Sequence, residues 1–152
     1  EEDAWSGRTP PDDERRFIEI NKAGQKAYKG GPETSQTRAR RAEALKNWGQ
    51  KGFKNWVAVL SHMPDDGGDG FIALHMTLDR DITLKTAMNI DPKSDLHRKA
   101  YTLPYGTTVQ ISGVFVMDLQ EKDYFREMSK TEAGGLESPE WLIEITSFKA
   151  LD

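Results

Sequence analysis

Hydrophobic residues recur at helical spacing in the first third of the chain. After the polar stretch EEDAWSGRTPP, an apolar stripe follows at intervals of three, four and seven residues, made of Phe17, Ile20, Gly24, Ala27 and Tyr28. This spacing predicts a helix with one buried face. Asp12 and Asp13 favour its N-terminus, and Gly30-Gly31-Pro32 ends it.

A second helix is predicted to begin between Glu33 and Ser35 and to end near Trp48. The residues expected on its buried stripe are Ala39, Ala42, Leu45 and Trp48, and those expected largely off it are Arg38, Arg41 and Lys46. The period changes from helix to strand after Gly49. We therefore expect a tail and a helical hairpin in residues 1–48 and a separate β domain in residues 49–152.

The rest of the chain alternates between apolar and polar residues, which predicts strands. The five expected strands are 53–62, 71–78, 82–89, 107–117 and 141–148. The turn-rich stretch PDDGGDG would join the first two, and SDLHRKAY would form a short helix before the fourth. In the third strand Met88 is expected to point inward. The segment EKDYFREMSK, before the fifth strand, has a helix-like pattern anchored by Tyr124, Phe125 and Met128.

One glycine, Gly113, interrupts the otherwise regular strand YGTTVQISGVFVMD. Long strands of a small closed barrel must bend sharply, and glycines or bulges allow this. The alternative is a glycine that makes room for Trp56 or Trp141 across the sheet. We favour the bend, because Val109, Ile111 and Phe115 keep one inward register on both sides of the glycine.

This order of elements resembles the OB-fold, a five-stranded Greek-key barrel. The segments that carry the resemblance are NWVAVL, GFIALHMTLDRDITLKT, GTTVQISGVF and PEWLIEITSF, within about residues 50–150. In outline the chain is similar to small bacterial OB-fold proteins with anticodon-binding-like barrels, some of them exported. The expected fold class is therefore mainly β, with an OB-fold barrel preceded by a helical hairpin.

The resemblance implies a ligand face on the outer side of the second and third strands. Carried onto this chain, that face offers Phe71, His75, Thr77, Thr83, Lys85 and Asn89. An aromatic ring, an imidazole and an ammonium group can stack on and neutralise a short single strand of nucleic acid.

A second candidate is a basic patch on the predicted hairpin, made of Arg38, Arg40, Arg41 and Lys46. Basic residues interleaved with aromatic ones are typical of nucleic-acid contacts. The same arginines can instead solvate a helix face. The connection from Asp118 to Glu140 is acidic and can pair with this hairpin, in its own chain or in a neighbour.

The composition of the chain limits the classes of function that it can have. The 152 residues carry a net charge of −4, so attraction to a polyanion must come from a local patch. The absence of cysteine excludes disulfides and thiolate chemistry. No apolar run is long enough to cross a membrane. The chain opens on EEDAW, without a leader, which is expected of a processed form exported to the periplasm or, alternatively, of a trimmed fragment.

Neither a catalytic motif nor a metal site is predicted. The chain has no GxSxG, GxxxxGK[ST], GxGxxG or HExxH pattern. His62, His75 and His97 lack ligand spacing, and Asp65, Asp66 and Asp69 fit a hairpin turn better than a calcium loop. We expect no cofactor and a non-catalytic binding module for single-stranded nucleic acid or another anionic ligand. The alternative is a protein-interaction or scaffold module, or a homo-oligomer, that uses the hairpin and the acidic connection.

Overall fold

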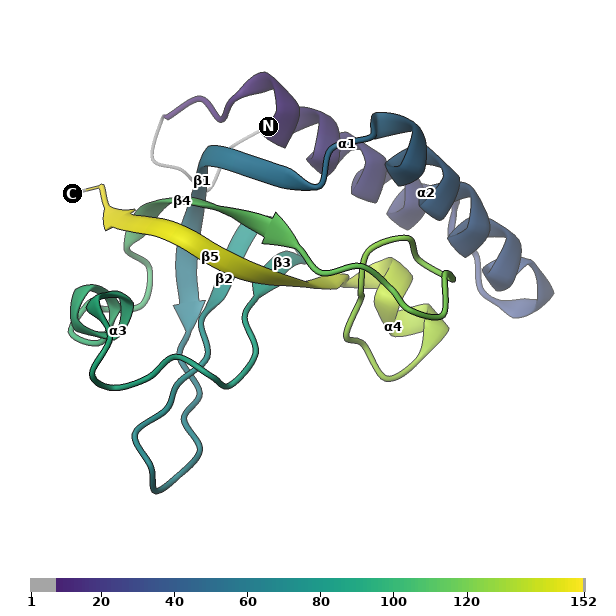
Figure 1. The fold of residues 1–152 in the computed structure, drawn as a ribbon. Helices are drawn as coiled ribbons and strands as arrows, with labels where there is room; N and C mark the ends of the chain where they lie inside the picture. Colours follow the sequence, from purple (N-terminus) through teal and green to yellow (C-terminus); the bar gives the residue numbers. More distant parts are fainter. Residues whose placement is uncertain (1–7, 152) are drawn as a thin grey trace.

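The computed structural model describes residues 8–151 and contains a closed five-stranded barrel preceded by two helices (Figure 1). The elements are α1 Asp12–Ala27, the 3-10 helix η1 Gly31–Glu33, α2 Thr34–Trp48, β1 Gly52–His62, β2 His75–Asp79, β3 Ile82–Lys85, α3 Asp95–Ala100, β4 Thr108–Phe115, α4 Glu132–Glu137 and β5 Glu140–Ala150. The predicted fold class is confirmed. Both long helices lie within a residue or two of their predicted positions.

The strand order around the barrel is β1-β2-β3-β5-β4. Strands β3 and β5 pair in parallel, and the other neighbours pair antiparallel. This is the Greek-key arrangement expected of an OB-like barrel. Figure 1 shows the helices α1 and α2 along one side of the barrel, with the α4 connection beneath them, whereas α3 and the β1–β2 loop lie away from the helices.

Gly113 lies where the ladders on both sides of β4 change register. The β4–β5 pairing shifts between Ser112 and Gly113, and the β1–β4 pairing shifts between Phe53 and Trp56. A Cβ atom on Gly113 would lie 2.3 Å from the carbonyl oxygen of Glu144 and 3.1 Å from Cζ of Phe53. The bend is therefore present, and the atoms that need the space belong to Glu144 and Phe53 rather than to Trp56 or Trp141.

The helices and the barrel share one aromatic core. Phe17 of α1 is fully buried, and its ring centroid lies 4.9 Å from that of Phe115, 5.4 Å from Trp56 and 6.0 Å from Trp141. Trp48, at the end of α2, lies 5.6 Å from Phe17. The helix α2 then ends at Gly49, whose φ of 73° is left-handed and whose N–H donates to the carbonyl of Leu45.

Three local predictions are wrong. Strands β2 and β3 are shorter than expected, and Met88 is exposed because it lies in the loop after β3. The buried face of α2 contains Thr37, Arg41 and Leu45, whereas Ala39 is exposed. The segment EKDYFREMSK is not helical, because residues 126–128 pair with the start of β5 instead.

Candidate ligand-binding face

Strand pairing brings five residues into one line across the outside of the barrel. His62 pairs with His75, His75 with Lys85, and Lys85 with Leu142. Leu142 donates its N–H to the carbonyl of Arg126 at 3.0 Å, which continues the line across the 126–128 segment. Because paired residues of a sheet share a face, the side chains of these five residues lie on the same face of the barrel. We name these five residues the cationic row. At the usual strand spacing it is about 19 Å long.

A second line of polar side chains lies beside the cationic row. Thr77 pairs with Thr83, and Thr83 with Glu140. Lys85 joins the two lines, because its Nζ atom lies 3.0 Å from Oε1 of Glu140. The face thus offers two hydroxyl groups beside one ion pair.

Three polar rings gather at one end of the cationic row. The ring centroids of His62 and His75 are 5.6 Å apart and nearly perpendicular, and the ring of Tyr105 lies 5.9 Å from His62. Tyr105 is 57% exposed. Burial, with the nearby charges of Lys85 and His62, lowers the pKa of His75 below its ordinary value, so its imidazole is neutral at physiological pH.

Four of the six predicted ligand-face residues lie together on this surface. They are His75, Thr77, Thr83 and Lys85. Phe71 and Asn89 lie outside the paired residues of β2 and β3. They directly precede Ile72 and Ile90, which form an isolated antiparallel bridge. Phe71 is half-buried, and Asn89 is exposed in the loop that follows β3.

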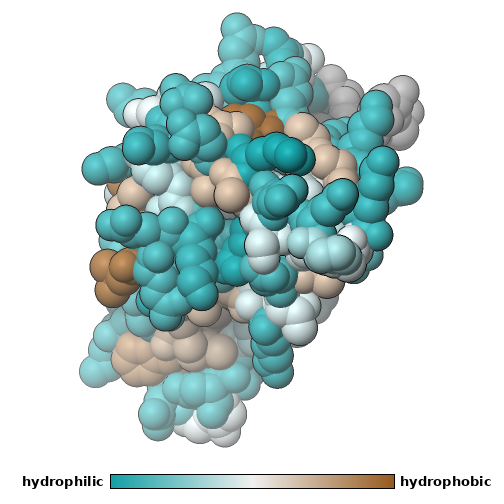
Figure 2. Space-filling view, turned by 90° about the vertical axis from the view of Figure 1, so that its right-hand side faces the viewer, coloured by the Kyte–Doolittle hydropathy of each residue, from teal (hydrophilic) through white to brown (hydrophobic). Residues whose placement is uncertain are grey.

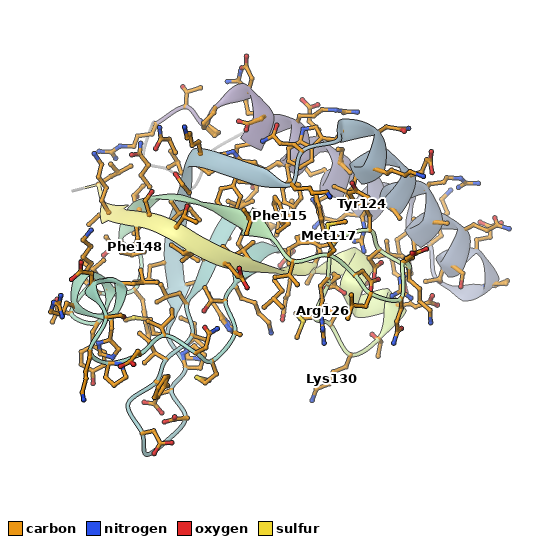
Figure 3. All side chains as sticks on the ribbon, in the orientation of Figure 1. Phe115, Met117, Tyr124, Arg126, Lys130 and Phe148 are labelled. Atoms are coloured by element: carbon orange, nitrogen blue, oxygen red, sulfur yellow. The ribbon has the colours of Figure 1, made fainter. Side chains whose placement is uncertain are left out.

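Sequence reasoning missed His62, Tyr105 and Arg126. His62 reaches this face only because a bulge shifts the register of β1 between Leu60 and His62. Arg126 belongs to the segment whose pattern predicts a helix; it is exposed, and Figure 3 shows it pointing away from the helices, as Lys130 does. In the segment FREM the apolar residues Phe125 and Met128 are three positions apart, which is helical spacing, so no local signal in the sequence identifies Arg126.

The predicted basic patch is divided between structural and exposed residues. Arg38 donates two hydrogen bonds of 2.7 Å to the carboxylate of Asp123, and Arg41 donates a third of 3.3 Å. The guanidinium of Arg41 is buried, with its carbon 4.8 Å from the centroid of the Trp141 ring. Arg40 and Lys46 are exposed. The acidic connection therefore pairs with the hairpin of its own chain.

A buried carboxyl group, Glu14, holds the start of α1 against the barrel. Its Oε1 accepts a 2.7 Å hydrogen bond from the N–H of Val57, whereas Oε2 has no hydrogen-bond partner among residues 8–151. Burial raises the pKa of Glu14 to about 8, with the Val57 hydrogen bond opposing the shift and the charge of Asp13 adding to it.

The high pKa of Glu14 predicts a pH-dependent stability. Folding raises the pKa of Glu14, so protonated Glu14 stabilises the folded state. This contribution to the unfolding free energy is complete below the unfolded pKa of 4.5 and is lost as the pH rises through about 8. We expect Glu14→Gln to flatten the decline of the unfolding free energy between pH 5 and pH 8 by about 2 to 3 kcal/mol, measured by urea denaturation. Glu19→Gln, an exposed change on the same helix, is the control. Parallel pH profiles for wild type and Glu14→Gln would contradict the assignment.

Comparison of the chain with protein-family models, curated proteins and solved structures gives no significant match. Within residues 8–151, no helix combines the length and apolar character needed to cross a membrane. The same part of the chain contains no group of three or more histidine or acidic side chains placed to hold a metal ion. Function is therefore inferred from the geometry of the face itself.

Proposed function

We propose that the protein is a non-catalytic OB-fold binding module, similar in outline to small bacterial OB-fold proteins, whose cationic row binds a short single strand of nucleic acid. The observation that carries this proposal is the row itself. It combines the cations Lys85 and Arg126 with the imidazoles of His62 and His75, on the face that OB-folds use for ligands.

The two kinds of side chain have separate roles in this proposal. Lys85 and Arg126 are two strands apart, about 10 Å at the usual spacing, and can contact different phosphates of one strand. The rings of His62, His75 and Tyr105 offer stacking surfaces for bases. Thr77 and Thr83 lie beside the row and can donate hydrogen bonds to the ligand.

The test is fluorescence anisotropy with a short labelled oligothymidylate at low and at moderate salt. We expect Lys85→Ala and Arg126→Ala each to weaken binding, and each to reduce the slope of log affinity against log salt by roughly 0.7, the value for one lost phosphate contact on a single strand. Lys149→Ala, an exposed cation near the other end of β5, should change neither quantity. Flat binding curves at low salt would contradict the proposal.

A second candidate function is protein interaction, and one surface favours it. A groove of about 640 Å³ lies between α2 and the loop after β4, lined by Ala39, Ala42, Met117 and Tyr124 among others. Leu119, which also lines it, is 87% exposed. Figure 2 shows this side of the molecule to be largely hydrophilic, with hydrophobic side chains only in separate patches. Failure of oligonucleotide binding would leave this surface as the stronger candidate.

A further inference from the structure

A bulge in β1 places two histidines side by side on the ligand-binding face. Leu60 pairs with Met76, but the next pair is His62 with His75, so β1 has one additional residue, Ser61, at this point. Without the bulge, Ser61 would face His75 and His62 would point to the opposite side of the sheet. The hydroxyl of Ser61 instead donates a 2.9 Å hydrogen bond to the carbonyl of His75, which holds the bulge in place.

The separation of the two rings fits a shared metal ion. In a tetrahedral site each ligating nitrogen lies about 2.1 Å from the metal, and the ring centre lies about 1.1 Å further away, so two imidazole centroids are about 5.2 Å apart. The centroids of His62 and His75 are 5.6 Å apart and tilted by 72°.

We propose that His62 and His75 together bind a divalent transition-metal ion of the Zn²⁺, Ni²⁺ or Cu²⁺ class through one ring nitrogen each. Imidazole suits these borderline ions, and harder ions such as Mg²⁺ prefer oxygen.

The surroundings limit the affinity and leave coordination positions open. No third histidine or acidic ligand completes the site within residues 8–151. The ammonium of Lys85 disfavours a cation beside it, although Glu140 partly neutralises that charge at 3.0 Å. Tyr105 lies next to His62 and presents its ring, and a phenol oxygen is a weak ligand for these ions. The remaining positions therefore face solvent.

If the proposed function holds, these open coordination positions are available to the bound nucleic acid. An ion held at the end of the cationic row can accept a phosphate oxygen or a base nitrogen of the bound strand. It would then add two positive charges to a face on which the cationic row itself supplies only Lys85 and Arg126 as permanent cations.

The test is isothermal titration calorimetry of the untagged chain with Zn²⁺ and with Ni²⁺ alone. We expect one ion per chain, and at least a tenfold loss of affinity for both His62→Ala and His75→Ala. His97→Ala is the matched control, because His97 of α3 stacks on Tyr101, just after that helix, and has no histidine partner among the described residues. His62 is exposed and His75 is half-buried, and circular dichroism would check that both variants fold.

Nuclear magnetic resonance gives a second readout. Paramagnetic Ni²⁺ should broaden the ring signals of His62 and His75 before those of His97. Equal affinity of the His62/His75 double variant and the wild type, or equal broadening of all three rings, would overturn the proposal. Oligonucleotide binding that persists in a chelator would support the proposed function and show that it does not need the metal. Metal binding without oligonucleotide binding would support the metal site and contradict the proposed function.

Discussion

Replacing Gly113 by alanine is expected to destabilise the barrel by more than about 3 kcal/mol, because a backbone atom occupies the position of the new methyl group. The added Cβ would lie 2.3 Å from the carbonyl oxygen of Glu144, and that carbonyl can move only if β4 and β5 separate. For a chain of this length the expected loss corresponds to a fall in Tm of roughly 10 °C. Urea and thermal denaturation followed by circular dichroism would measure both quantities.

Gly68→Ala is the matched control for this prediction. Gly68 is exposed in the β1–β2 loop, a methyl group added there would meet no atom within 4 Å beyond its chain neighbours, and its φ is not left-handed. We expect a change of less than about 1 kcal/mol, in either direction. Equal stabilities of Gly113→Ala and Gly68→Ala would show that β4 does not need its glycine, and the explanation for the bend would be lost.

Gly113 also shows which parts of the fold the sequence can predict. Its position inside a regular strand is a local signal, and the bend it indicates leads to the correct closed barrel. The end of α2 is predictable for the same reason, since Gly49 stops this helix through its own backbone conformation. These features depend on a residue and its immediate neighbours in sequence.

The parts that are not predictable depend on distant partners. The segment around Arg126 has a helical pattern, but backbone hydrogen bonds to Glu140 and Leu142 hold it extended. Arg41 is expected off the buried stripe because arginine is usually exposed, and only the loop folded over α2 makes its burial tolerable. His62 and His75 are 13 positions apart in sequence, and only the bulge in β1 brings their rings together.

The candidate site follows the same division. Four residues of one hairpin, His75, Thr77, Thr83 and Lys85, can be assigned to a face from alternation alone. Arg126 and His62 extend that face through pairings that alternation cannot reveal. The predicted basic patch does not form one exposed surface, because two of its arginines pair with a buried carboxylate. The net charge along the sequence does not show which arginines have such a partner.

That carboxylate, Asp123, gives the second large prediction. Its side chain is 3% exposed, and it accepts two 2.7 Å hydrogen bonds from Arg38 and one of 3.3 Å from Arg41, whose own side chain is 1% exposed. Burial lowers the pKa of Arg41 and the charge of Asp123 opposes that shift. Loss of Asp123 would leave a buried guanidinium without the carboxylate that contacts it, and only the charge of Glu127 would still favour its ionised form.

We expect Asp123→Asn to cost about 3 to 5 kcal/mol of unfolding free energy, measured by urea denaturation. The matched control is Glu132→Gln, because Glu132 also pairs with Arg38, at 3.0 Å, but is 41% exposed and should contribute less than about 1 kcal/mol. Similar losses for the two variants would mean that Asp123 acts as an ordinary surface partner. A large loss confined to Asp123→Asn would show that the helical hairpin and the β4–β5 connection stabilise each other through one buried carboxylate.

Because Arg126 lies three residues further along that connection, Asp123→Asn should then also weaken oligonucleotide binding under conditions in which the variant remains folded.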